Sequence, residues 1–240
     1  MNIQKKLLCT AGAILLLGTT NLFATAQSAR DILNHSYQYL GSMDKYAFTA
    51  VVSDEVAQDA KMSNAYTHTT RVKVDRPSKL RVETTGTIKN RTNYLNDGSY
   101  TMFDHHSKFY GQIKTPKTIN DTLDVLFEKF NIHAPLAQLI YSGMDKKVKF
   151  AKSKYFGTKI VDGLECDYIA FRNGKKEVHI WIATGDTPLV KAYSIINTSK
   201  NHPSRVNTSV TWDENADISD SDFVFVAPKG ASKISVNQVN

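Results

Sequence analysis

Polar and apolar residues alternate with a period of two along most of the chain beyond residue 45. Between residues 65 and 75, for example, Tyr66, Val72 and Val74 alternate with Thr67 and Lys73. Because successive side chains of a strand point to opposite faces, this pattern predicts β-strands with one buried and one wet face. The predicted strands are 46–54, 65–75, 79–86, 91–96, 99–104, 108–113, 154–161, 164–172, 175–182, 189–197 and 206–212.

Short polar turns separate several of these strands. Asn96-Asp97-Gly98, Asp162-Gly163 and Asn173-Gly174 each lie between aromatic or β-branched runs. Asn, Asp and Gly tolerate the positive φ angles of two-residue hairpins. Neighbouring strands are therefore predicted to pair antiparallel.

Helical periodicity is found in two places. A capping box, Ser28-x-x-Asp31, precedes apolar residues at i, i+4 and i+7 that end near Gly41. A second helical region, about 119–141, interrupts the strands. It is predicted to hold one amphipathic helix with Leu123, Leu126, Phe127 and Phe130, and a shorter one that begins at Ala134-Pro135 and carries Leu136, Leu139 and Ile140.

These elements predict a mainly β fold with helices (α+β). Eleven strands are too many for a small sandwich and suit a large curved antiparallel sheet or unclosed β-barrel. The apolar faces of the helices and the sheet must bury one another. We therefore expect two or three helices to cover the sheet, with 119–141 as a lid.

The first 26 residues are typical of a cleaved export signal. Lys5 and Lys6 precede an apolar run, and Ala24-Thr25-Ala26 has the small-x-small form of a cleavage site. The mature protein, 27–240, is then expected to be a single periplasmic domain. Further along, the sequence has no apolar run long enough to span a bilayer, so no transmembrane anchor is expected after cleavage.

Composition narrows the classes of function. The formal net charge of +7 is spread over scattered basic residues, and no nucleic-acid motif is present, so nucleic acid is not an expected partner. This charge is either a solvated surface or an attraction to anionic lipid headgroups. Of the two cysteines, Cys9 lies within the signal, so Cys166 can form no intramolecular disulfide in the mature chain.

Several motifs resemble a known family. They are Val72-Lys73-Val74-Asp75-Arg76-Pro77, Tyr94-Leu95-Asn96-Asp97-Gly98, Leu139-Ile140-Tyr141-Ser142, Val161-Asp162-Gly163-Leu164-Glu165-Cys166 and Trp181-Ile182, with a closing segment from Trp212 to Gly230. Over about residues 28–234 the chain is similar to the predicted periplasmic proteins of the "domain of unknown function 2092" family, within the LolA/LolB-like lipoprotein-carrier superfamily. The resemblance implies a LolA-like open barrel, lidded by helices, with an apolar cavity that accepts acyl chains.

The resemblance also suggests a role for Arg76. In LolA-type carriers the arginine of an Arg-Pro pair holds the lid closed by hydrogen bonds to helix backbone, and Arg76 occupies the matching position. The alternative is an ordinary solvated residue before a bend, where Pro77 restricts the preceding backbone in any case.

Candidate catalytic groups are few. Asp104-His105-His106 is the densest group of possible ligands, but adjacent strand residues point to opposite faces, which favours a polar hairpin tip over a metal site. Cys166 lies within a strand pattern and is interpreted as a small buried hydrophobe instead of a nucleophile. No catalytic residues, metal ligands or cofactors are therefore predicted.

Aromatic and aliphatic side chains give the stronger indication. A sheet of this size encloses more volume than side chains readily fill, so some of them are expected to line a cavity. The predicted lining residues are Phe48, Tyr66, Leu80, Tyr94, Phe103, Tyr110 and Trp181 from strands, and Leu123, Leu126, Phe127, Leu139 and Ile140 from the lid.

Three functions stay open at this point. The first is non-enzymatic binding or carriage of a lipid, an acyl chain or a lipid-modified partner such as a lipoprotein. The second is an envelope sensor or scaffold that uses the same fold for contacts with another protein. The third is a hydrolase that depends on the Asp104 group or on Cys166.

Overall fold

The computed structural model of the chain describes residues 28–57, 63–132, 134, 136–199 and 204–239. The predicted export signal, residues 1–26, lies outside the described residues, as does Pro135.

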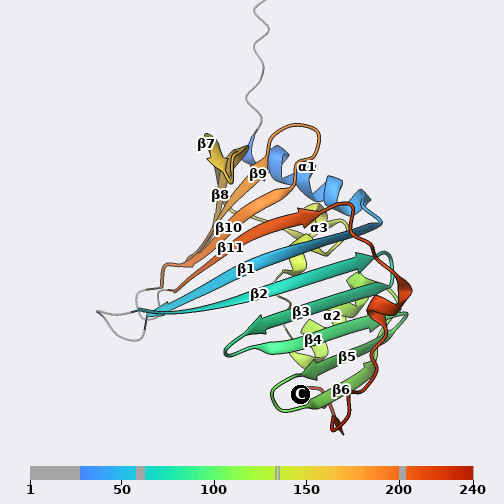
Figure 1. The fold of residues 1–240 in the computed structure, drawn as a ribbon. Helices are drawn as coiled ribbons and strands as arrows, with labels where there is room; N and C mark the ends of the chain where they lie inside the picture. The colour runs from blue at the N-terminus through green and yellow to red at the C-terminus, as the bar shows by residue number, and fades with distance from the viewer. Residues whose placement is uncertain (1–27, 58–62, 133, 135, 200–203, 240) are drawn as a thin grey trace, which may run out of the picture.

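One large, twisted sheet dominates the structure (Figure 1). In the described part of the chain its strand order is β12-β6-β5-β4-β3-β2-β1-β11-β10-β9-β8-β7. The described pairings are antiparallel except for β12 with β6, which is parallel, and the edge strands β12 and β7 do not meet. The predicted fold class, a large unclosed antiparallel sheet covered by helices, is confirmed.

Each of the eleven predicted strands is present, and a twelfth is added at the C-terminal end. The strands are β1 (Lys45–Ala57), β2 (Ser63–Asp75), β3 (Lys79–Gly86), β4 (Asn90–Asn96), β5 (Ser99–Asp104), β6 (Phe109–Lys114), β7 (Lys152–Val161), β8 (Leu164–Asn173), β9 (Lys176–Ala183), β10 (Val190–Asn197), β11 (Ser204–Asp213) and β12 (Ser232–Ile234). The predicted hairpins form as well. Asp97 and Gly98, and likewise Asp162 and Gly163, have the positive φ angles that such turns require.

Two α-helices and two shorter helical segments cover one face of the sheet, which we call the inner face. They are α1 (Ala29–Ser42), α2 (Ile119–Phe130), η1 (Ala137–Leu139) and α3 (Met144–Lys147). The capping box that opens α1 forms as predicted, with the Ser28 hydroxyl accepting from the Asp31 backbone at 3.2 Å. The main core lies between these helices and the inner face, around Tyr46, Ala50 and Leu40.

The shorter helix predicted from Ala134 is wrong. Its described residues form only a three-residue 3₁₀ turn, η1, followed by the separate one-turn helix α3. The apolar residues Leu136, Leu139 and Ile140 are buried as the pattern indicated, but they are buried by an irregular chain.

The opposite face, called here the outer face, is partly covered by the C-terminal segment 214–239. After β11 this segment runs past the ends of β2 to β6 (Figure 1, red) and includes η2 (Asp220–Phe223). Phe225 inserts among Tyr94, Phe103 and Tyr110, with ring centroids 5.0–5.8 Å apart.

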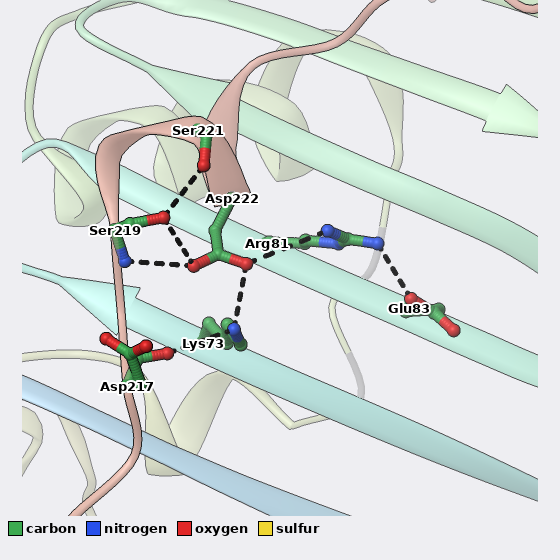
Figure 2. Close-up of polar contacts among 7 residues, drawn as sticks. All are labelled: Lys73, Arg81, Glu83, Asp217, Ser219, Ser221 and Asp222. Carbon is green, nitrogen blue, oxygen red and sulfur yellow. Dashed lines mark hydrogen bonds and ion pairs between the residues drawn. The ribbon is translucent and has the colours of Figure 1, made fainter.

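Ion pairs fasten the same segment to the outer face (Figure 2). The Asp222 carboxylate accepts from Lys73 Nζ at 2.8 Å and lies 4.0 Å from Arg81. The hydrogen bond from Lys73 is the main reason that the pKa of Asp222 is lowered. Because this carboxylate is largely shielded from solvent, the pair positions η2 over β3 and β4.

The end of the segment reaches α2. Beyond β12, the backbone N–H of Val239 donates to the carbonyl of Lys129 in α2 at 2.9 Å. Val236 lies against Gly111 of β6, at a place where a larger residue than glycine would collide with it. The C-terminal segment therefore contacts both the outer face and the helical cover.

Candidate functional site

A cavity lies between the inner face of β2–β5 and helix α2, and we call it the α2 cavity. Its volume is about 70 Å³. The helical side is provided by Leu123, Leu126, Ile132, Ala134, Leu136 and Ile140, and the sheet side by Val52, Thr70, Leu80, Val82, Thr84, Tyr100 and Met102. These walls are largely apolar. The polar residues His68, Lys89, Arg91 and Asn93 complete the lining.

A wider cavity adjoins the first at the ends of β1, β2 and β11, and we call it the outer chamber. Its volume is about 450 Å³, and its lining mixes Tyr66, Ile88 and Val206 with the charged residues Asp54, Glu55, Lys89 and Arg205. His68 and Lys89 line both cavities. The site therefore has a narrow apolar part under α2 and a broader polar part at its end.

Six of the predicted lining residues contact a cavity. Leu80, Leu123, Leu126 and Ile140 line the α2 cavity, and Tyr66 lines the outer chamber. Leu139 lines a separate cavity of about 170 Å³ between η1, α1 and strands β9 and β10. Leu80 meets Leu123, Leu126 and Ile140 because α2 and the chain after it lie across the inner face.

Two more of them lie on or near the cover but line none of these cavities. Phe48 is buried in the core, 4.9 Å from Trp212 between ring centroids. Phe127 follows Leu126 on α2, but its side chain is 55% exposed.

Four predicted lining residues lie on the outer face, opposite to the prediction. Tyr94, Phe103 and Tyr110 surround Phe225, and Trp181 stacks on Tyr168 at 4.7 Å. The physical reason is register. Leu95, the neighbour of Tyr94, is the residue that points to the core, so Tyr94 faces the other way. Phe103 and its cross-strand partner Tyr110 share that outer face.

Arg76 lies at the bend between β2 and β3 and binds the end of α1. Its Nε donates to the Met43 carbonyl at 3.0 Å, and Nη2 donates to Leu40 O at 3.4 Å and to Tyr46 Oη at 2.9 Å. Carbonyls at the end of a helix lack partners within the helix, so a guanidinium group suits this position. Arg76 is thus hydrogen-bonded to helix backbone, although to α1 instead of the region 119–141.

A second hydrogen bond extends this contact to the cover. The Tyr46 hydroxyl donates to the carbonyl of Leu139 in η1 at 2.9 Å. The next residue of the bend, Pro77, accepts from the backbone N–H of Ile119 at the start of α2 at 2.8 Å. The Arg76-Pro77 bend therefore contacts α1 directly, α2 directly, and η1 through Tyr46.

Sequence reasoning missed the polar members of the site. Arg91 and Asn93 share the inner face of β4 with Leu95, and His68 and Thr70 share that of β2 with Val72. The alternation contains this information, since each lies two or four positions from a core residue. The prediction omitted them because it selected aromatic and aliphatic residues only.

Electrostatics at the junction of the two cavities is dominated by cations. Lys89 Nζ lies 3.8 Å from the Asp54 carboxylate. The pKa of His68 is lowered, first by burial and then by the positive charge of Lys89, with Arg91 acting in the same direction. His68 therefore adds no charge near neutral pH, and the fixed charges at the junction come from Lys89, Arg91 and Asp54.

The groups considered for catalysis do not come together at one reaction centre. His105 and His106 lie in an exposed turn, and His105 Nε2 is hydrogen-bonded to Thr92 at 2.8 Å. Cys166 is fully buried as predicted, and burial raises the pKa of its thiol. Within the described residues, no three His, Cys, Asp or Glu side chains are grouped as metal ligands.

No described helix is both long and apolar enough to cross a membrane.

Comparison with known proteins gives one family match. A family model described as "Predicted periplasmic protein (DUF2092)" matches residues 29–237. No curated protein matches the chain.

Three of the similar solved structures each cover at least 80% of this chain. An uncharacterized conserved protein from Thermus thermophilus has a TM-score of 0.51 at 11% identity, over 86% of this chain and 98% of that one. The lipoprotein LppX of Mycobacterium tuberculosis scores 0.40 at 10% identity, over 80% and 98%. A LolA superfamily protein from Nitrosomonas europaea scores 0.35 at 10% identity, over 82% and 98%. The Thermus protein shares the fold, whereas the two lower scores establish neither fold nor function by themselves.

Proposed function

Because the chain belongs to the DUF2092 family of predicted periplasmic proteins, we propose that residues 1–26 direct it to the periplasm and are cleaved there. We further propose that the mature protein binds or carries a lipid, an acyl chain or a lipid-modified partner, and catalyses no reaction. The observation that supports this most directly is the α2 cavity, a largely apolar space between sheet and helix that shares His68 and Lys89 with the more polar outer chamber.

The chemistry of the cavity suits a hydrocarbon chain. Leu80, Val82 and Met102 on the sheet face Leu123 and Leu126 on the helix, and no charged side chain comes from α2. Each methylene buried between such walls contributes about 0.8 kcal/mol. A single acyl chain would therefore bind usefully without a specific polar contact.

The size of the cavity adds a requirement. At about 70 Å³ the α2 cavity is well below the roughly 300–1,000 Å³ that is typical of ligand sites. An acyl chain can occupy it only if α2 and the chain after it separate from the inner face. We propose that binding widens the space under α2.

The direct test is native mass spectrometry of the protein purified from the cell envelope, with organic extraction of the same sample. A bound lipid is expected, with a mass that disappears after extraction. A protein that is empty in every preparation, and that takes up no fluorescent fatty acid when one is added, would refute the proposal.

A pair of variants on α2 locates the site. Leu126→Gln places a polar amide in the α2 cavity, whereas Phe127→Gln changes the neighbouring exposed side chain by the same substitution. Fatty-acid binding is expected to weaken at least tenfold in the first variant and to change less than twofold in the second. Circular dichroism establishes that both are folded. Equal effects in the two variants would place the ligand elsewhere.

A second candidate function, an envelope scaffold, is favoured by the edge strand β7. Tyr155, Phe156 and Ile160 leave apolar side chains exposed there, with Ile160 at 70%. An edge strand with such residues can pair with another protein. For this function Ile160→Lys should abolish crosslinking to an envelope partner and leave lipid content unchanged. Crosslinking that survives the substitution would argue against it.

A further inference from the structure

Arg91 occupies an unusual position within the site. It lies on the inner face of β4, opposite Thr84 of β3 in register, and its side chain lines the α2 cavity. Most of the other cavity walls are apolar. The guanidinium group of Arg91 therefore places a positive charge at the edge of a largely apolar cavity.

No described group neutralises Arg91. Its Nε is buried and lacks a hydrogen-bond partner among the described residues. Its Nη1 lies 4.0 Å from the thioether sulfur of Met102, which is a weak acceptor. A buried donor without a partner is unfavourable for stability, so its retention calls for an explanation.

The carboxylates of the neighbouring strand and of the outer chamber have other partners. Asp104 of β5 lies opposite Arg91 of β4 in the strand pairing. Its Oδ1, however, accepts from the backbone N–H and the hydroxyl of Ser107, at 2.8 and 2.9 Å. Asp54 pairs with Lys89. In the outer chamber, Glu55 accepts from the side-chain amide of Asn207 at 3.2 Å. After these contacts, the guanidinium group of Arg91 is left, among the described residues, as the unpaired cation of the α2 cavity.

We propose that Arg91 is the headgroup site for an anionic amphiphile, whose carboxylate or phosphate pairs with the guanidinium group while its hydrocarbon chain lies under α2. The inference rests on the proposed function, which it extends by naming the ligand class. The planar guanidinium group offers two parallel donors to an oxyanion, which makes such pairs strong and directional. Lys89, at the junction of the two cavities, adds positive charge on the solvent side.

The test uses three probes that separate the headgroup from the chain. Dodecanoate carries both, dodecanol carries the chain alone, and acetate carries the oxyanion alone. Isothermal titration calorimetry on the mature protein should show dodecanoate binding about tenfold to a hundredfold more tightly than dodecanol, the range expected for a charge-assisted hydrogen-bonded pair. Acetate should bind more than a hundredfold more weakly than dodecanoate, because it buries no chain.

Variants then assign the preference to Arg91. Arg91→Gln should reduce dodecanoate affinity at least tenfold and leave dodecanol affinity within twofold. Arg91→Lys, which keeps the charge and loses the planar fork, should restore part of the affinity. The control is Arg71→Gln, which removes the same charge from the outer face of the nearby strand β2 and should alter neither probe.

Thermal unfolding shows whether the Arg91→Gln variant is still folded. Because Arg91 Nε has no described partner, Arg91→Gln should melt at the same temperature as the unsubstituted protein or higher. Equal binding of dodecanoate and dodecanol, or equal loss of both in Arg91→Gln, would overturn the headgroup site and leave the proposed function intact. Binding of neither chain would overturn both. Acetate binding as tight as that of dodecanoate would identify a simple anion site and also overturn the inference.

Discussion

Replacing Arg76 by Met should loosen η1 as well as α1. Arg76 binds α1 through the Leu40 and Met43 carbonyls and contacts η1 through the Tyr46 hydroxyl. Methionine retains the length of the side chain but removes its donors. Two helix-end carbonyls and one buried hydroxyl then lose their charged partner.

The expected magnitude follows from these contacts. Hydrogen bonds to a charged group contribute about 1.5–3 kcal/mol each, and two of the three have good lengths, 3.0 and 2.9 Å. Relief from desolvation of the guanidinium group offsets part of this sum. We therefore expect a loss of about 2–4 kcal/mol in the free energy of unfolding, or a fall in Tm of about 4–16 °C for a protein of this size.

Two measurements distinguish a local loosening of η1 from a loss of stability of the whole fold. Urea unfolding gives the total loss, and Arg81→Met, a change at an outer-face ion pair, serves as the control with a loss of at most about 1 kcal/mol. Hydrogen exchange then reports on the amides of Ile140 and Tyr141, which both donate to the Ala137 carbonyl at 2.9 Å. These amides should exchange faster in Arg76→Met.

A double-mutant cycle tests the path through Tyr46. Tyr46→Phe removes the hydroxyl that joins Arg76 to Leu139, so the combined variant should lose less than the sum of the single losses, by about 1 kcal/mol. Unchanged exchange at Ile140 and additive losses would refute the reasoning, because Arg76 would then hold α1 alone.

Three further predictions concern other parts of the fold. Gly111→Ala should lower stability by about 1–3 kcal/mol because its methyl group collides with Val236. Adding Val236→Ala should restore the stability in a thermal melt, whereas a neutral Gly111→Ala would show that the C-terminal segment does not pack there. Cys166 should react with iodoacetamide far more slowly in the native protein than in urea, since burial raises the pKa of its thiol; equal rates would contradict the burial. The pKa of Asp222 is lowered by Lys73, so the stability from this pair is present above the ordinary carboxyl pKa and is lost as pH falls through the lowered value. Asp222→Asn should therefore flatten the acid side of a plot of stability against pH. An unchanged slope would contradict the pairing.

Much of the fold was predictable because its signals are local. Alternation and the Asp-Gly and Asn-Gly turns predicted eleven strands and the antiparallel pairing of sequence neighbours, which is found within β1–β6 and within β7–β11. The pairing of β1 with β11, which joins the two groups, was not predicted. The family named from the motifs is confirmed. The strand that was missed, β12, has three residues, all exposed, and so carries no periodic signal. The helix predicted from Ala134 failed because burial of Leu136, Leu139 and Ile140 does not by itself require helical backbone.

The faces of the strands were harder to assign. Alternation divides the residues of a strand into two sets but does not say which set faces the helices. In β4 both sets contain a large side chain, Tyr94 in one and Leu95 in the other. The choice is made by Phe225, more than a hundred residues away, which covers the outer face of β4 to β6. Such a contact leaves no trace in the local pattern of either segment.

The way in which the cover is attached bears on how a ligand could reach the cavity. The sheet is held by ladders of backbone hydrogen bonds between its paired strands. The backbone of α2 is tied to the bend and to the C-terminal segment by single hydrogen bonds at its two ends, and the Thr122 hydroxyl adds one bond to Pro116 O at 2.8 Å. Ile119 donates to Pro77 O at 2.8 Å at one end, and Lys129 O accepts from Val239 at 2.9 Å at the other. A segment attached in this way can separate at a free energy well below that of global unfolding. The α2 cavity could therefore widen for a hydrocarbon chain while the sheet, Arg91 included, keeps its geometry.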